Sequence, residues 1–333
     1  MAVHDKITVD EYNSIQSGIE EVLGTGGNDF GYGQRVLSNQ VTVSDRITIN
    51  EYSALRYDII NAYRHIENQY PTGVDEKAAG DTVRFNAADE PVTYWNSVVN
   101  DIRNNRLTLV PSGQRASLNI GGDDYTQAWG YTGNEQTQVR GLQATIVCTW
   151  PTAEQARHFF NAGGFFEITS SRTGGTISPQ NSDWTTLLNN VGAFRFSAST
   201  PSTGLNPNNG KNWFRLSNTL QKIYTLSGSS PYGDNEFEIY ASSDVADNSN
   251  GSARRLELQL RWNDDHDPQG IPGSSPTPIP SDVVEEGPDK VDGTLRYDVV
   301  AYYASGLLVP ASAGTFTVDT PTSFSAGNIA PQA

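Results

Sequence analysis

The residues best suited to chemistry lie in one acidic turn, "WNDDHDP", which contains Asp264, Asp265, His266 and Asp267. Carboxylate oxygens crowded into so few positions have the chemistry to coordinate a divalent cation. The same residue types are common where a strand ends, because Asp and Asn side chains hydrogen-bond the backbone of the following turn. The stretch lacks the spacing and the terminal Glu of a calcium-binding loop. The sequence therefore favours a turn, and Asp264, Asp265 and Asp267 are the candidate metal ligands.

Two further stretches, both expected to be loops, carry side chains that suit a sugar ligand. "GGDDY" contains Asp123 and Asp124, and paired carboxylates can act as acid and base in glycoside hydrolysis. "QAWGYTG" contains Trp129 and Tyr131, which can either stack on a sugar or anchor the loop in the core or in a neighbouring subunit. Asp is frequent in the loops of this chain, so the carboxylate pattern has little specificity. For Trp129 the sequence favours anchoring.

The common sequence patterns of enzymes are missing from the chain. It contains no G-x-S-x-G nucleophile elbow and no phosphate-binding loop with its Lys. "GTGGND", which begins at Gly24, follows a helix instead of a strand and so does not fit a dinucleotide site. None of the four histidines is paired with another at metal-ligand spacing. We therefore expect a protein that is not an enzyme and has no cofactor.

The chain opens with two copies of one helix start, at an offset of 40 residues. "ITVDEYNSIQSGIEEVLG" and "ITINEYSALRYDIINAYRHI" each begin with a Thr-x-x-Glu capping box. Behind the caps, Tyr12, Ile15 and Ile19 share one helical face, and Leu55 and Ile59 share another. Six aligned identities favour a duplication over chance. We expect the two apolar faces, together with Trp129, to contact partner subunits.

The remaining pattern predicts an α+β protein with a small N-terminal helical region and a large, mainly antiparallel β-sheet or sandwich that contains short inserted helices. "ARRLELQLRW" and "DGTLRYDVVAYYAS" alternate apolar and polar residues, as strands with one wet face do. The predicted domains are a helical docking region at 1–75, a connecting helix with short strands at 76–136, and a β-rich domain at 137–333. Within the last, residues 267–288 are rich in Pro, Gly and Ser and predict a long surface loop.

The composition excludes several classes of partner. The net charge is −16 and no basic run is present, so we expect no nucleic-acid groove. No stretch is long and apolar enough to cross a bilayer, and the first residues do not resemble a signal peptide. The single cysteine, Cys148, rules out an internal disulfide framework. We therefore expect assembly in a reducing cytoplasm, without a membrane partner.

Several segments, taken in order, resemble virion structural proteins of contractile-tailed bacteriophages, especially marine ones that infect cyanobacteria. The two helix starts quoted above are similar to the N-terminal region of such proteins. "TIVCTWPTAEQARHFFNAGGFFEITSSRTGGT" resembles their central block, and "VDGTLRYDVVAYY" resembles a later strand. The resemblance covers most of the chain and brings no catalytic residue with it.

The resemblance implies a non-enzymatic structural component of the virion, in the tail, baseplate or neck, that acts through subunit contacts. Its expected partners are other virion structural proteins and further copies of itself in a symmetric ring, assembled in the host cytoplasm. One alternative is a receptor- or carbohydrate-binding module of the tail or capsid surface, with Trp129 and the loop at 263–288 as its sugar face. A glycan-cleaving enzyme that uses paired Asp residues is the third interpretation.

Overall fold

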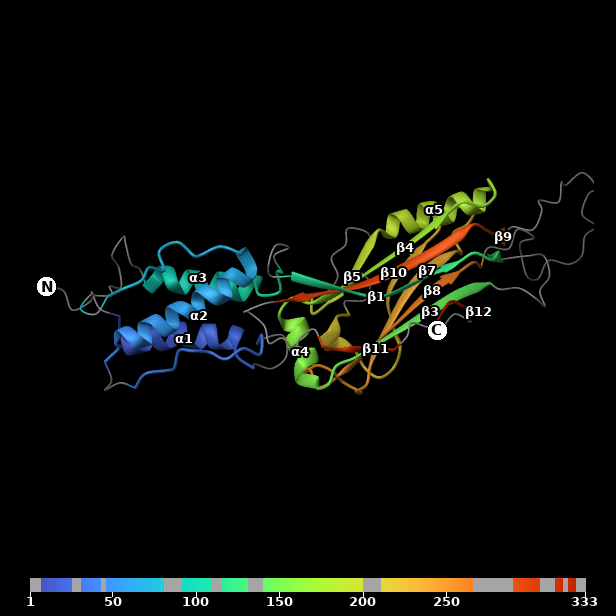
Figure 1. The fold of residues 1–333 in the computed structure, drawn as a ribbon. Coiled ribbons are helices and arrows are strands. Elements are labelled where there is room, and N and C mark those ends of the chain that lie inside the picture. The colour runs from blue at the N-terminus through green and yellow to red at the C-terminus, as the bar shows by residue number, and fades with distance from the viewer. Residues whose placement is uncertain are drawn as a thin grey trace, which may run out of the picture.

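The chain is elongated, with a helical unit at one end and a β-sandwich at the other (Figure 1). The computed structural model describes residues 7–25, 31–42, 46–78, 80, 92–109, 115–130, 140–199, 211–265, 290–305, 315–319 and 323–327. The predicted α+β class, with helices first and a large antiparallel sheet region after them, is confirmed.

The helical unit consists of α1 (Val9–Leu23), α2 (Ile49–Glu67) and α3 (Val92–Asn105). Both predicted capping boxes are present, at the N-termini of α1 and α2. The apolar stripes of all three helices meet in one core, in which Ile19, Ile59 and Ile102 are fully buried. The predicted domain boundary at residue 75 is therefore too early, because α3 packs with the first two helices.

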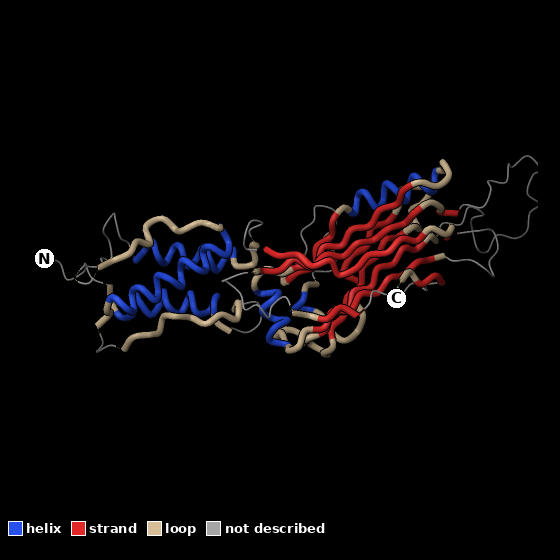
Figure 2. The backbone as a smooth tube through the Cα atoms, in the orientation of Figure 1, coloured by secondary structure: helices blue, strands red, loops and turns tan. Residues whose placement is uncertain are grey.

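Each of the first two helices binds the chain segment that follows it. Residues 31–42 run back along the unit after α1 (Figure 2), and the side chain of Asn13 exchanges two 2.9 Å hydrogen bonds with the backbone of Val41. After α2, the side chain of Arg56 donates a 2.9 Å hydrogen bond to the carbonyl of Val74. The duplicated unit is thus a capped helix together with a returning arm.

Two antiparallel sheets form the sandwich. In the described part of the chain, one sheet has the strand order β1-β10-β4-β5, and the other has the order β6-β7-β8-β3, with β11 and β12 both on the outer edge of β3. A short pair, β2-β9, forms a separate two-stranded sheet. The strands are β1 (Arg115–Tyr125), β2 (Trp129–Gly130), β3 (Gly141–Thr149), β4 (Phe165–Thr173), β5 (Ala193–Ser197), β6 (Gln221–Ser227), β7 (Glu236–Ser243), β8 (Arg255–Asn263), β9 (Lys290–Val291), β10 (Thr294–Ala304), β11 (Thr317–Asp319) and β12 (Ser325–Gly327). The inserted helices are α4 (Ala153–Asn161), α5 (Pro179–Val191) and a 3₁₀ turn at Trp213–Arg215.

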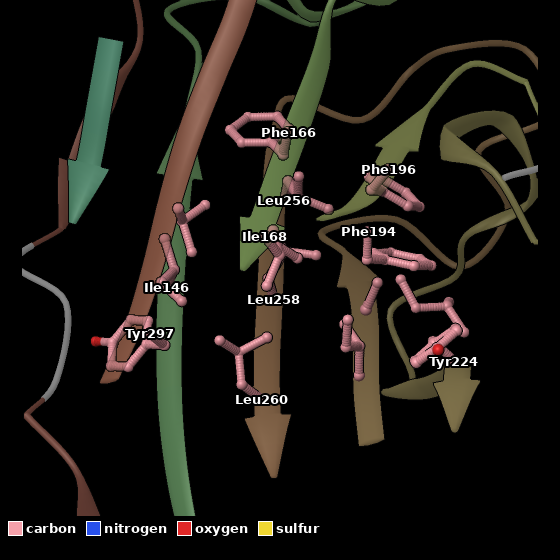
Figure 3. Packing of buried hydrophobic residues seen from close by; sticks show 14 of the residues in the cluster. Ile146, Phe166, Ile168, Phe194, Phe196, Tyr224, Leu256, Leu258, Leu260 and Tyr297 are labelled. Atoms are coloured by element: carbon pink, nitrogen blue, oxygen red, sulfur yellow. The ribbon is translucent and has the colours of Figure 1, made fainter. Parts of the chain in front are cut away.

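The apolar faces of the two sheets pack against each other to form the larger core (Figure 3). Ile168 of β4 and Leu258 of β8 both lie in this layer and are almost completely buried. The indole N–H of Trp262 crosses between the sheets and donates a 3.0 Å hydrogen bond to Ser170 Oγ. Period-two alternation in the sequence therefore identified the inward faces of β8 and β10 correctly.

The stretch "GGDDY" is not the loop that its composition suggests, because β1 continues through it as far as Tyr125. The register shifts between Asn119 and Gly121, which is a β-bulge, and the strand then pairs with β10 down to Leu295. β1 therefore belongs to the sandwich, and the predicted connecting region at 76–136 divides between the two units.

The two units meet at α4 and the turn that follows it. His65 of α2 is hydrogen-bonded through Nε2 to the carbonyl of Ala162 at 3.0 Å. Arg157 of α4 donates a 3.2 Å bond to the carbonyl of Thr25. Gly33 lies so close to His158 that a Cβ at this position would overlap the imidazole ring. This close packing fixes the helical unit to the base of the sandwich.

Candidate functional site

The acidic turn after β8 begins with a carboxylate that is buried in the sandwich. Asp264 is fully buried, and its backbone N–H donates a 2.8 Å bond to the carbonyl of Arg140. Its carboxylate accepts hydrogen bonds from Gln180 Nε2 and, at 3.5 Å, from Trp184 Nε1. A cation at Asp264 would have to displace these bonds, so this side chain acts as a structural acceptor.

The other candidate ligands of the acidic turn do not complete a metal site among the described residues. Asp265 is exposed, and Asp267 lies outside the described residues together with His266. Across the described parts of the chain, no group of three or more His, Cys, Asp or Glu side chains is arranged to hold a metal ion.

Trp129 anchors β2 in the core. Its side chain is 2% exposed, and its ring meets that of Trp184 edge-on at a centroid distance of 4.8 Å. The structure thus shows the anchoring that the sequence favoured, within this chain and not in a neighbouring subunit. A buried indole has no free face for a sugar ring, so the alternative reading of Trp129 as a stacking platform is wrong. Tyr131 lies outside the described residues.

The apolar faces of α1 and α2 are also interior surfaces. The five residues expected to contact a partner are at most 1% exposed, namely Tyr12, Ile15, Ile19, Leu55 and Ile59. They pack against one another and against α3, so a partner cannot reach them while the helical unit is folded. Their assignment as docking residues is corrected for this reason.

Other apolar side chains of the helical unit do reach the surface. Leu37, Tyr57 and Tyr70 are 49%, 51% and 67% exposed. The backbone N–H of Leu37 donates to the carboxylate of Asp58, so the segment that carries Leu37 is bound to α2. In the sequence, the signal for this exposed site was Tyr57, an aromatic residue on the otherwise polar face of α2.

The paired aspartates of β1 do not form an acid–base pair. Successive residues of a strand point to opposite faces of the sheet, which separates the carboxylates of Asp123 and Asp124. Asp124 is ion-paired with Arg296 at 3.1 Å, and Arg296 also pairs with Asp298 at 2.6 Å. This arrangement is a surface ion-pair cluster, in which the carboxylates of Asp124 and Asp298 share one arginine.

Cys148 and His65 are of the residue types that act as nucleophile or base in enzymes, and both are buried. Cys148 is 1% exposed, and burial raises its pKa to about 12, so its thiol stays protonated at neutral pH. His65 is fully buried, and desolvation lowers its pKa to about 4. Neither group is poised to exchange a proton with a substrate near neutral pH.

None of the family models, curated proteins or solved structures with which the chain was compared matches it. Among the described helices, none is long and apolar enough to cross a bilayer.

Proposed function

We propose that the chain is a non-enzymatic structural component of a tailed-phage virion, in the tail, baseplate or neck, and that it acts through contacts between subunits. The observation that carries this proposal is the overall architecture of the molecule. A duplicated unit of capped helix and returning arm is packed onto the base of a β-sandwich, which gives an elongated part with helices at one end and strands at the other (Figure 1). Such a shape suits a subunit that links two neighbours.

The surface of the helical unit supports a docking role for this end of the molecule. Leu37, Tyr57 and Tyr70 each expose about half or more of the side chain, whereas the apolar core residues of the unit are packed inside. Aromatic residues exposed in this way are enriched at the centres of protein interfaces. The proposed partners are other virion proteins and further copies of the chain in a symmetric ring.

The direct test is immunogold electron microscopy of purified virions, with antibody raised against the full-length chain. Gold at one position on the particle supports the proposal and assigns that position to the neck, baseplate or tail. Protein found in the infected-cell lysate, with no gold on particles, would show that the chain is not a virion component.

A matched pair of variants tests the docking surface. We expect Tyr57→Glu to stop incorporation into particles, because a charge replaces an exposed ring at the proposed contact. Ile177→Glu is the control, since Ile177 is fully exposed and lies between β4 and α5 of the sandwich. Equal incorporation of both variants, each shown to be folded by circular dichroism, would exclude Tyr57 from the contact.

A further inference from the structure

A cleft of about 520 Å³ lies where the four-stranded sheet meets the helical unit. Its walls include two cationic side chains, Arg115 from the start of β1 and Arg195 from β5. Phe165, Ser197 and Ser199 also line it. Clefts of this volume commonly hold a small ligand or a few side chains of a partner. Two guanidinium groups in one cleft are notable in a chain whose net charge is −16.

The two arginines belong to one row of stacked side chains that crosses the outer face of the sheet. Arg195 lies over the ring of Phe165 at 4.9 Å, and Phe165 stacks on Tyr302 with centroids 4.9 Å apart and an interplanar angle of 27°. At the far end, Arg115 lies over the ring of Tyr302 at 4.9 Å. The row therefore runs through β5, β4, β10 and β1 in turn.

This stacking prepares both guanidinium groups for an anionic ligand. A guanidinium that lies flat on an aromatic ring loses rotamer freedom, while the N–H groups at its edge stay able to donate. Arg195 uses its Nε to bind Glu167 at 2.7 Å. Arg115 makes no ion pair among the described residues, and its charge faces the cleft. Carboxylates and phosphates are the anions that such planar donor groups hold with two bonds at once.

The same geometry argues against a sugar as the ligand. A sugar ring needs the free face of an aromatic side chain, and the faces of Phe165 are taken by Tyr302 and Arg195. The hydroxyls of Ser197 and Ser199 are hydrogen-bonded to each other at 2.9 Å. What the cleft offers is positive charge at fixed positions.

We propose that this arginine-lined cleft binds the carboxylate side chains of an acidic segment from a partner protein. The identity of that partner as a virion subunit rests on the proposed function, whereas the anion site rests on its own geometry. Charge complementarity favours such a partner, since the carboxylates of a neighbouring acidic subunit would meet the two arginines. The site adds a second contact surface to the one proposed around Tyr57.

The test is fluorescence anisotropy with the full-length protein and a labelled hexaglutamate peptide at low salt. We expect binding of hexaglutamate, no binding of hexaglutamine, and a loss of about tenfold in affinity for Arg115→Gln or Arg195→Gln, which each remove a charge-assisted bond. Arg254→Gln is the control, because Arg254 is an exposed arginine paired with Asp244 outside the cleft. Its affinity should stay at the wild-type value.

Several outcomes would overturn the inference. Absence of hexaglutamate binding, or an equal loss in Arg254→Gln, would show that the cleft is not an acidic-peptide site. Inorganic phosphate that displaces the peptide completely at equal concentration would reduce the cleft to a simple anion site. The assay uses no virions, so its failure leaves the immunogold result untouched, and the two proposals fail separately.

Discussion

Acidification should loosen the junction between the helical unit and the sandwich through His65. The imidazole is fully buried there, its Nε2 is bonded to the carbonyl of Ala162 at 3.0 Å, and its ring lies 4.4 Å from that of Tyr32. The other ring nitrogen, Nδ1, has no hydrogen-bond partner in the described part of the chain. Protonation would place an N–H and a full charge in this apolar contact, which explains why the pKa is lowered to about 4.

The magnitude follows from linkage. The unfolded chain binds a proton at His65 with the ordinary pKa of 6.5, whereas the folded chain does so at about 4. Between these values the unfolded state holds more protons, so the free energy of unfolding falls as the pH falls. From pH 7.5 to pH 4.5 this residue alone should remove about 2.5 kcal/mol of stability, at about 1.4 kcal/mol per pKa unit.

The assay is urea unfolding of the wild type and of His65→Gln, followed by circular dichroism at pH 7.5, 6.5, 5.5 and 4.5. Gln is neutral throughout and keeps a donor, so the variant should be less stable at pH 7.5 and should lose less on acidification. Burial raises the pKa of Asp58 and lowers that of His158, and both groups titrate in either protein, so their effects cancel in the comparison. Parallel pH profiles for the two proteins would refute the assignment to His65.

Three further predictions test other contacts, two by urea unfolding and one by hydrogen exchange. Gly130→Ala should cost about 3 kcal/mol or more, because φ is +89° and a Cβ would overlap the Asp264 carboxylate, whereas Gly174→Ala, with φ +70° and open space, should cost only about 1 kcal/mol. Equal losses would disprove the overlap. Thr8→Ala should cost about 1 kcal/mol through loss of the α1 cap, and an unchanged stability would contradict that role. Asp58→Ala should speed hydrogen exchange at the Ser38 amide, which now donates to Asp58 at 2.8 Å, and unchanged exchange would exclude this clamp.

The features that the sequence predicted well are those set by local chemistry. A capping box needs only Thr8 and the Glu three residues later, so its pattern can be read without any knowledge of the fold. The inward faces of β8 and β10 follow from alternation along one strand. In both cases the decisive interaction lies within a few residues, or depends only on which side of the element is apolar.

The features that it missed depend on contacts between distant segments. "GGDDY" is expected to be a loop from its composition, yet β10 offers a partner for each of its residues, and the bulge after Asn119 absorbs the mismatch. Asp264 belongs to an acidic turn in the sequence, which does not reveal that Gln180 and Trp184 fold onto its carboxylate. Composition reports only the type of each residue, whereas the role of the residue depends on the distant segments that it contacts in the fold.

The same distinction explains why the apolar faces of α1 and α2 were assigned to a partner while the arginine row went unseen. An amphipathic pattern requires that a face be covered, but the covering surface here is α3, whose own stripe completes the core. Strand alternation likewise places Phe165 and Tyr302 on outward faces, but their stacking depends on the register that sets them opposite each other in β4 and β10. Register is fixed by the hydrophobic faces on the inner side of the sheet. The inward pattern that the sequence reveals therefore also determines the outward neighbours, and with them the position of both guanidinium groups in the cleft.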